Sequence, residues 1–307
     1  MKHFIDLKNL TAANLAELLD LADQLKAETK AGHARPILAG KTLGMIFAKS
    51  STRTRVSFEV GMYQLGGHAL FLNTQDIQLG RGESIRDTAK VMSRFLDAIM
   101  IRTFSHQDVL DLARFGSIPI INGLTDLMHP CQAVADLMTV REHFGSLKGL
   151  KLAYIGDGNN VANSLLQACA RAGMDVAVAA PAGFSCDPGC VEDAREQAVL
   201  QGSQVILTDD PLVAVKNADV LYADTWVSMG QEAEKADRLA VFQPYQVNEG
   251  LMALASPGAV FLHCLPAYRG MEVTGPVIDG PASLVFDEAE NRLHAQKAIL
   301  VSLMAGN

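Results

Sequence analysis

Lys49-Ser50-Ser51-Thr52-Arg53-Thr54-Arg55 is the stretch that decides the fold of this chain. It follows an apolar run at 42–48 that is typical of a buried strand. It leads into a run at 56–65 whose apolar residues recur at helical spacing and which ends at Gly66-Gly67. The sequence therefore predicts a strand, a hydroxyl-rich turn and the start of a helix.

The predicted helix start has the composition of an anion-binding site. The first turn of a helix leaves backbone N–H groups unpaired and carries the positive end of the helix dipole. The hydroxyls of Ser51, Thr52 and Thr54 and the guanidinium groups of Arg53 and Arg55 add further donors. Together these donors suit a phosphate, which arginine can bind in a bidentate manner. The alternative is a serine that only caps the helix, followed by two solvated arginines.

Composition narrows the class of protein. The 307 residues, of which 49% are hydrophobic, suffice for one or two domains of ordinary size. A net charge of −8 argues against nucleic acid or an anionic membrane as a partner. Residues 1–8 mix charged and apolar side chains, unlike a signal peptide, and no run approaches the roughly 20 apolar residues of a membrane span. Five cysteines in such a chain predict free thiols and a cytoplasmic location.

Strand-like runs recur along the chain, with helical stretches between them. They lie at 42–48, 68–72, 98–101, 118–121, 151–155, 175–180, 204–207, 219–222 and 259–263. This alternation predicts an α/β fold with doubly wound parallel sheets. The pattern restarts near 147–149, which indicates a second domain. A terminal helix from about residue 290 could carry Arg292 back toward the first domain.

Polar side chains follow several of the predicted strands. Arg102 ends one strand, and His129 and Gln132 stand at another helix start. Asp224 and Cys264 follow strands of the second half. Open parallel sheets bind ligands at the carboxyl ends of their strands, so these residues are candidates for a site. The alternatives are an arginine leaving the core, a His and Gln that cap a helix, a turn aspartate and a small core cysteine.

Two patterns invite a cofactor or a metal, and both are incomplete. Gly156-x-Gly158 follows a strand, but the third glycine position of the dinucleotide fingerprint holds Val161. Cys186 and Cys190 could form half of a metal site, but no second pair exists. We therefore expect neither a nicotinamide cofactor nor a bound metal.

The motifs together resemble a known family. Residues 51–55 followed by Ser57-Phe58-Glu59 resemble the carbamoyl phosphate signature of the aspartate and ornithine carbamoyltransferases. His129-Pro130-Cys131-Gln132, the segment 224–230 and His263-Cys264-Leu265-Pro266 follow in the order and spacing of the ornithine enzymes. The aspartate enzymes lack the Ser-Met-Gly segment and have proline where this chain has cysteine. The chemistry agrees, because a cationic amine calls for an acidic partner, whereas aspartate calls for arginines, which are absent from 222–230.

The resemblance implies an architecture and a set of site residues. It implies two doubly wound domains with the active site in the cleft between them: a carbamoyl phosphate-binding domain at 1–140, completed by the helix at 291–307, and an ornithine-binding domain at 147–288. The implied carbamoyl phosphate contacts are Ser51, Thr52, Arg53, Thr54, Gln78, Arg102, His129, Gln132, Cys264, Leu265 and Arg292. The implied ornithine contacts are Asn163, Asp224, Ser228 and Met229. Arg102, His129, Asp224 and Cys264 are the implied catalytic residues.

The resemblance also implies a reaction and an assembly. The side-chain amine of L-ornithine attacks the carbamoyl carbon directly and gives L-citrulline and phosphate, with no metal or cofactor. The enzyme would be a cytoplasmic homotrimer of arginine biosynthesis with active sites near the subunit interfaces, where Gln78 reaches a neighbouring subunit's site. One alternative is carbamoyl transfer to putrescine or N-acetylornithine. Another is a non-catalytic anion-binding protein, which gives Asp224 and Cys264 no role.

Overall fold

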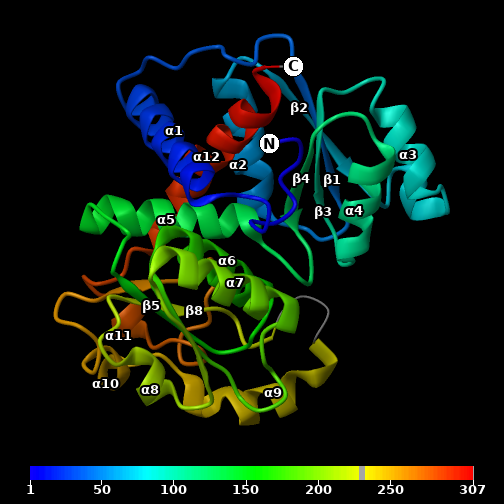
Figure 1. Cartoon of the computed structure of the whole chain (residues 1–307). Coiled ribbons are helices and arrows are strands. Elements are labelled where there is room, and N and C mark those ends of the chain that lie inside the picture. Colours follow the sequence, from blue (N-terminus) through cyan, green and yellow to red (C-terminus); the bar gives the residue numbers. More distant parts are fainter. Residues whose placement is uncertain (228–231, 307) are drawn as a thin grey trace. The chain divides into compact units, whose positions relative to one another are not determined.

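The chain forms two compact units in a computed structural model that describes residues 1–227 and 232–306 (Figure 1). Unit 1 consists of Met1–Ala135 together with Asn291–Asn307, and unit 2 consists of Asp136–Glu290. The division therefore falls inside two helices, α5 (Pro130–Phe144) and α12 (Val285–Met304), and each of them contributes residues to both units.

Unit 1 is built around a parallel sheet with the strand order β2-β1-β3-β4. Its strands are β1 (Thr42–Phe47), β2 (His68–Asn73), β3 (Ala98–Arg102) and β4 (Ile120–Leu124). Its other helices are α1 (Ala12–Lys30), α2 (Thr52–Gln64), the 3-10 helix η1 (Gln78–Arg81), α3 (Ile85–Met92) and α4 (His106–Phe115).

Helices cover both faces of this sheet (Figure 1). The α3 and α4 side is closed by an apolar cluster in which Ala89, Val109 and Leu112 of the helices pack with Ile46 and Ile99 of the strands. On the other side, α2 and α12 are near neighbours, and Lys297 of α12 donates a hydrogen bond to Gln64 of α2. This arrangement makes unit 1 a doubly wound α/β layer structure.

Unit 2 repeats the plan with the strand order β7-β6-β5-β8-β9, all parallel. Its strands are β5 (Lys151–Ile155), β6 (Asp175–Ala179), β7 (Val205–Thr208), β8 (Val220–Ala223) and β9 (Val260–Leu262). Its helices are α6 (Asn160–Ala172), α7 (Pro188–Gln201), α8 (Pro211–Val215), η2 (Glu232–Glu234), α9 (Lys235–Phe242), η3 (Gln243–Tyr245), α10 (Glu249–Met252) and α11 (Gly275–Ile278).

Each sheet has one point at which the chain reverses its direction of travel across the sheet. In unit 1 this point lies between β1 and β3, and in unit 2 between β5 and β8. Ligands of doubly wound sheets bind outside the carboxyl ends of the strands at such points. The predicted α/β class with parallel sheets is confirmed, and the topology singles out the ends of these four strands.

Several predicted element boundaries differ from the structure, and two of these differences have a clear physical reason. Strand β4 begins at Ile120 rather than at 118, because Pro119 has no N–H to donate to a neighbouring strand. The terminal helix begins at Val285 rather than near 290, and Asp287 and Glu288 occupy its first turn, where acidic side chains favour a helix N-terminus.

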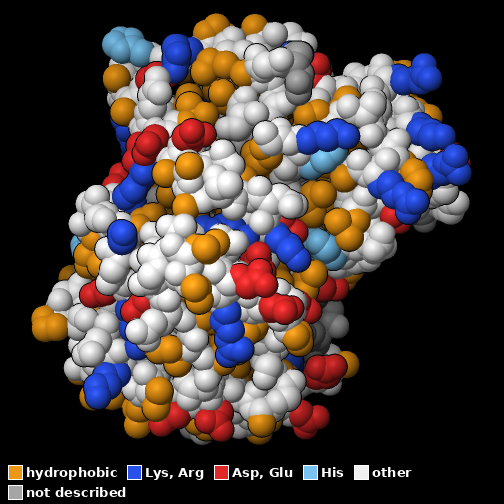
Figure 2. Space-filling model, viewed as in Figure 1, with side chains coloured by type: hydrophobic (Ala, Val, Ile, Leu, Met, Phe, Trp, Pro, Cys, Tyr) orange, Lys and Arg blue, Asp and Glu red, His pale blue; other side chains and the backbone are white. Residues whose placement is uncertain are grey.

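The surface is mixed in character. Figure 2 shows acidic, basic and apolar side chains interspersed on the visible face, with basic side chains gathering over α3, which carries the exposed Arg86 and Lys90. In the described ranges, we find no helix that combines the length and the apolar character needed to cross a membrane.

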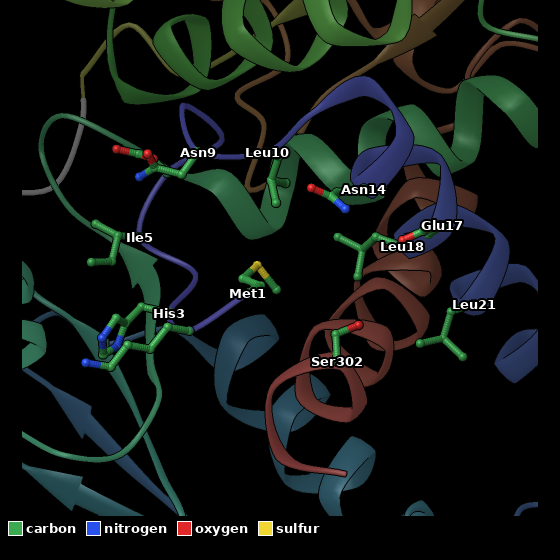
Figure 3. A pocket seen from close by; sticks show the side chains of 12 residues that line it. Met1, His3, Ile5, Asn9, Leu10, Asn14, Glu17, Leu18, Leu21 and Ser302 are labelled. Atoms are coloured by element: carbon green, nitrogen blue, oxygen red, sulfur yellow. The ribbon is translucent and has the colours of Figure 1, made fainter. Parts of the chain in front are cut away.

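A pocket of about 760 Å³ lies in unit 1 beside the N-terminal segment and α1 (Figure 3). His3, Leu10, Asn14 and Leu18 are among its lining residues, and Ser302 of α12 also reaches it. The site residues predicted from the sequence do not line this pocket, so it is separate from the predicted chemistry.

Candidate active site

The turn after β1 is built as the sequence predicts. β1 ends at Phe47, and α2 begins at Thr52 with Ser51 as its N-cap. The Ser51 hydroxyl accepts a hydrogen bond from the backbone N–H of Thr54 at 3.2 Å and lies 3.1 Å from the Thr54 hydroxyl. The strand, hydroxyl-rich turn and helix start are therefore confirmed, and the turn stands at the carboxyl end of a switch-point strand.

The last helix of the chain reaches this turn. The Nη2 atom of Arg292, on α12, donates a hydrogen bond to the hydroxyl oxygen of Thr54 at 2.8 Å, and both side chains are buried. The predicted return of Arg292 to unit 1 is confirmed by this contact between residues 238 positions apart.

Three arginine side chains exert their positive charge on His129. His129 is buried immediately before α5, and Arg102 is buried at the carboxyl end of β3, the other switch-point strand. Burial holds the pKa of His129 well below its usual value, and the positive charges of Arg292, Arg102 and Arg53 lower this pKa further. The imidazole is therefore neutral at pH 7, and three guanidinium groups lie close enough to act on it. A neutral donor surrounded by cations suits an anion that also carries a carbonyl group.

The two arginines of the signature diverge. Arg53 is half-buried and its charge acts on His129. Arg55 is exposed, pairs with Glu59 at 2.9 Å, and lies over the ring of Phe71 with 3.7 Å between the guanidinium carbon and the ring centroid. Only Arg53 of this pair is thus placed with the predicted site.

The remaining predicted carbamoyl phosphate contacts of unit 1 differ in their surroundings. Gln132 is fully buried in the first turn of α5, Thr52 is exposed, and Gln78 is exposed on η1. The role of each stays a prediction.

Asp224 accepts hydrogen bonds from the other members of the second group of polar residues. It follows β8, a switch-point strand of unit 2, and is buried. Its Oδ1 accepts hydrogen bonds from the backbone N–H of Thr225 at 2.8 Å and from the thiol of Cys264 at 3.2 Å. Its Oδ2 accepts from the side-chain amide of Asn159 at 2.8 Å. Asn159 follows β5, the other switch-point strand, and also caps α6. These contacts fix the orientation of the Asp224 carboxylate.

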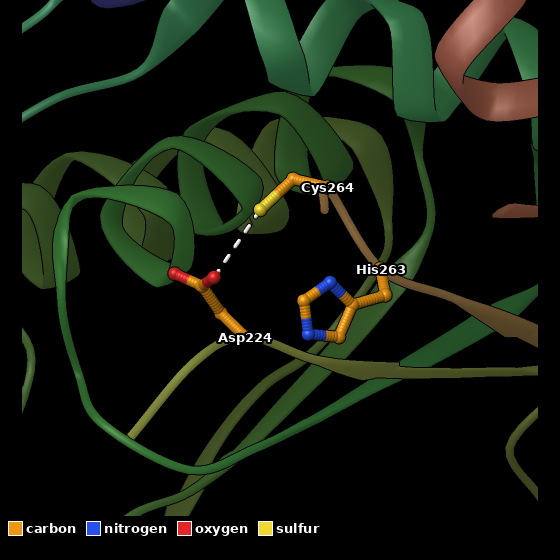
Figure 4. Close-up of side chains that lie close together, drawn as sticks. All are labelled: Asp224, His263 and Cys264. Atoms are coloured by element: carbon orange, nitrogen blue, oxygen red, sulfur yellow. Dashed lines mark hydrogen bonds between the residues drawn. The ribbon is translucent and has the colours of Figure 1, made fainter. Parts of the chain in front are cut away.

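Cys264 is a thiol rather than a thiolate. Burial raises its pKa well above the ordinary range, and the negative charge of Asp224 raises it further. Figure 4 shows its sulfur pointing at the Asp224 carboxylate, to which it donates. The side chain can therefore serve as a weak hydrogen-bond donor, and nucleophilic attack by its sulfur is disfavoured.

Of the predicted ornithine contacts, Asn163 is described and Ser228 and Met229 are not. Asn163 is buried on α6, and its side-chain oxygen accepts a hydrogen bond from the backbone N–H of Asp187 at 3.0 Å. Ser228 and Met229 fall between 227 and 232, outside the described residues.

The glycines after β5 have a packing role. A Cβ atom on Gly158 would lie 2.3 Å from the backbone nitrogen of Cys186, so only glycine allows this close approach of two backbones. Close packing of two backbones is therefore a sufficient structural reason for glycine at position 158.

Comparison with known proteins identifies the family of both halves of the chain. The family model described as "Aspartate/ornithine carbamoyltransferase, carbamoyl-P binding domain" matches residues 2–142, and the model of the "Asp/Orn binding domain" of the same family matches residues 148–303. The chain belongs to the aspartate/ornithine carbamoyltransferase family.

Relatives within this family are similar over their full lengths. The ornithine carbamoyltransferase of Symbiobacterium thermophilum is 59% identical over 304 residues, covering 99% of this chain and 98% of its own. That of Caldicellulosiruptor saccharolyticus is 57% identical over 306 residues, covering 100% and 99%. The solved structure of the ornithine carbamoyltransferase from Pyrococcus furiosus superposes with a TM-score of 0.97 at 53% identity and covers 100% of this chain and 98% of its own.

This carbamoyltransferase also contains buried residues that sequence reasoning missed. Glu288, in the first turn of α12, accepts hydrogen bonds from the Tyr222 hydroxyl at 3.1 Å and from the backbone N–H of His263 at 2.8 Å. Burial raises the pKa of Glu288 well above its usual value, and the neighbouring Asp136 raises it further. Glu272 is fully buried against His263. The acidic run at 287–290 was a sequence signal for Glu288, whereas no local pattern marks Glu272.

One cluster in the described ranges offers three potential metal ligands. Asp224, His263 and Cys264 present ligand atoms within 4.8 Å of one another (Figure 4). However, His263 accepts from the backbone N–H of Leu265 through Nδ1 at 2.9 Å and contacts Glu272 through Nε2 at 3.2 Å. Coordination by either nitrogen would break one of these contacts, so the arrangement favours hydrogen bonding over metal binding.

Replacement of Arg53 by alanine tests the anion site. We expect Arg53→Ala to weaken carbamoyl phosphate binding by about 1.5–3 kcal/mol, the value of a charge-assisted hydrogen bond, or roughly 10- to 150-fold. Arg55→Ala is the matched control, because Arg55 belongs to the same motif but contacts Glu59 and Phe71. Isothermal titration calorimetry measures both affinities. Equal affinities in the two variants would contradict the assignment of Arg53.

The lowered pKa of His129 predicts a pH dependence of stability. Between this pKa and the ordinary value of 6.5, the unfolded chain binds a proton that the folded chain does not. The contribution of the neutral His129 to the free energy of unfolding is therefore fully present above pH 6.5. This free energy falls as the pH drops below 6.5. In urea titrations from pH 7.5 to 5, His129→Gln should lose stability less steeply than the wild type. His33→Gln, at an exposed position, should keep the wild-type slope, and an unchanged slope in both variants would refute this prediction.

Proposed function

We propose that this carbamoyltransferase transfers the carbamoyl group of carbamoyl phosphate to the side-chain amine of L-ornithine and produces L-citrulline and phosphate. The observation that carries the proposal is the group of three guanidinium charges around the neutral, buried His129. Full-length relatives at 57–59% identity that bear the name ornithine carbamoyltransferase support the choice of reaction.

Unit 1 supplies the groups that hold carbamoyl phosphate. Ser51, Thr52, Arg53 and Thr54 bind the phosphate at the start of α2, and Arg102 bridges the phosphate and the carbonyl oxygen. His129 and Gln132 orient the carbamoyl group, and Arg292 completes this set. Because His129 is neutral, it acts as a hydrogen-bond donor to the carbonyl oxygen and not as an imidazolium. Donors of this kind stabilise the oxyanion that forms on attack by about 2.7–4 kcal/mol each in other enzymes.

Unit 2 supplies the groups that receive ornithine. The Asp224 carboxylate attracts the side-chain amine, and Asn163, Ser228 and Met229 bind the amino acid end. The backbone carbonyls of Cys264 and Leu265 accept from the carbamoyl amide nitrogen. The amine attacks the carbamoyl carbon directly, because the protonated Cys264 is a poor nucleophile.

The cellular setting follows from the same chemistry. Carbamoyl phosphate is a mixed anhydride and citrulline is a urea, so the reaction runs toward citrulline, which is the direction of arginine biosynthesis. The free thiols at 131, 169, 186, 190 and 264 suit a reducing compartment such as the cytoplasm.

The proposed assembly is a homotrimer formed through α2 and β2. β2 is an edge strand, and α2 and β2 together expose Val56, Tyr63, Leu70 and Phe71, with 82% of Tyr63 accessible. An exposed apolar edge favours association with another chain, and a second copy is the occupant we propose. Gln78 begins η1, the next element after β2, which suits its proposed reach into a neighbouring subunit's site.

Light scattering tests the trimer. The wild type should have a mass of roughly 99 kDa, three times 32.9 kDa. Tyr63→Glu places a charge on the apolar surface and should shift the mass toward the monomer. Val199→Glu, at a position that is 81% exposed on α7, is the control and should keep the wild-type mass. A monomeric wild type would exclude the trimer.

The reaction is tested by colorimetric detection of ureido product with carbamoyl phosphate and a panel of amines. We expect product with L-ornithine far above putrescine, N-acetylornithine and aspartate. The amine must be neutral to attack, and with a pKa near that of lysine only about one molecule in a thousand is neutral near pH 7.4. We therefore expect kcat/KM for ornithine to rise as the pH increases from 6.5 to 8.5. The rise should begin at about tenfold per pH unit.

The outcomes of the amine panel show which part of the proposed function would be wrong. Product with another amine would keep the phosphate site and move the error to the Asp224 region. No product with any amine would refute the proposed function, and a flat pH profile would contradict direct attack by a neutral amine.

A further inference from the structure

A buried hydrogen-bonded network surrounds the turn that follows β9. The Nδ1 atom of His263 accepts from the backbone N–H of Leu265 at 2.9 Å, and its Nε2 atom lies 3.2 Å from Oε1 of Glu272. The same Oε1 accepts from the backbone N–H of Tyr268 at 2.6 Å. His263 and Glu272 are both fully buried. One carboxylate oxygen thus holds residues 265 and 268, the first through an imidazole and the second directly.

The network defines the protonation of the imidazole. Because Nδ1 accepts a hydrogen bond, it carries no proton, and the proton of the neutral ring must be on Nε2. Nε2–H then donates to Glu272. Loss of the Glu272 carboxylate removes the acceptor that favours this tautomer, and the other tautomer would place two N–H groups, from His263 and Leu265, against each other.

The backbone at this turn needs such support. Leu265 has φ = +57°, in the left-handed region that a branched side chain rarely adopts. Its N–H belongs to the same planar trans peptide as the Cys264 carbonyl, and the two groups point in opposite directions. The hydrogen bond to His263 on one side of this plane therefore sets the direction of the Cys264 carbonyl on the other.

We propose that Glu272 is a positioning residue for the carbamoyl group: through the His263 tautomer it orients the backbone carbonyl of Cys264 toward the carbamoyl amide. The inference rests on the proposed function, in which this carbonyl accepts from the amide. Glu272 itself touches no substrate. It acts on the part of carbamoyl phosphate that distinguishes this molecule from other acyl phosphates, namely the NH2 group.

Acetyl phosphate provides the test, because it replaces this NH2 by a methyl group and keeps the carbonyl and the phosphate. Affinities for carbamoyl phosphate, acetyl phosphate and inorganic phosphate are measured on the full chain. The wild type should prefer carbamoyl phosphate over acetyl phosphate. Glu272→Ala should reduce this preference about tenfold, the effect of losing one or two neutral hydrogen bonds, and lower kcat, with phosphate affinity unchanged.

Two further variants define the mechanism. Glu272→Gln keeps an oxygen that can accept from His263 and Tyr268, so it should recover most of the preference. Glu249→Ala is the matched control: Glu249 accepts from the Thr274 hydroxyl at 2.7 Å on the exposed side of the neighbouring segment, and its loss should leave the preference unchanged.

The possible results distinguish the inference from the proposed function. A folded Glu272→Ala variant with the wild-type preference overturns the inference, and so does an equal weakening of all three ligands, which indicates a general structural effect. If this variant does not fold, Glu272→Asp, which is one methylene shorter, must show the loss of preference instead. Failure of the wild type to carbamoylate ornithine refutes the proposed function and not the network.

Discussion

Concentrated positive charge is the constraint on which the first unit depends. Arg53, Arg102 and Arg292 all act on one buried histidine, and like charges in a poorly solvated place repel one another. An anionic ligand relieves this repulsion, so the arrangement favours binding of a phosphate in a chain whose net charge is −8. The three arginines come from α2, β3 and α12, and the hydrogen bond from Arg292 to Thr54 ties the end of the chain to its beginning. The electrostatic site thus requires the complete unit.

The second unit has the opposite electrostatic character. Asp224 accepts hydrogen bonds from Asn159, Thr225 and Cys264, and burial keeps the Cys264 thiol and the Glu288 carboxyl protonated to unusually high pH. Such surroundings provide an acidic partner and weak donors, and they suit a cationic amine better than an anion. The two units therefore differ in the charge that they suit: the first suits an acyl phosphate and the second suits a cationic amine.

Much of the fold and part of the candidate site could be predicted from the sequence, because local sequence patterns determine them. Runs of apolar residues gave the strands, and Ser51 as cap and Arg102 as strand end followed from their positions beside those runs. Glu272 could not be found in this way, because no local pattern marks it and its role depends on its contact with His263. The acidic run at 287–290 marks Glu288, but its partner Tyr222 lies 66 positions away. The packing role of Gly158 could not be predicted locally either, because it depends on the backbone of Cys186, which is distant in the sequence.

The state of Cys264 decides where the proton chemistry of the reaction lies. A covalent route would need its thiolate, and burial and the Asp224 charge both oppose ionisation. In the proposed function, the same Asp224 charge would attract the protonated form of the amine. That form cannot attack, so binding would favour one protonation state and chemistry the other. Release of this proton must then precede attack, and the enzyme gains from holding the carbamoyl carbon ready while the neutral amine is rare. In the proposed mechanism, rigid placement of the carbamoyl group is therefore the main contribution that the protein can make to the rate.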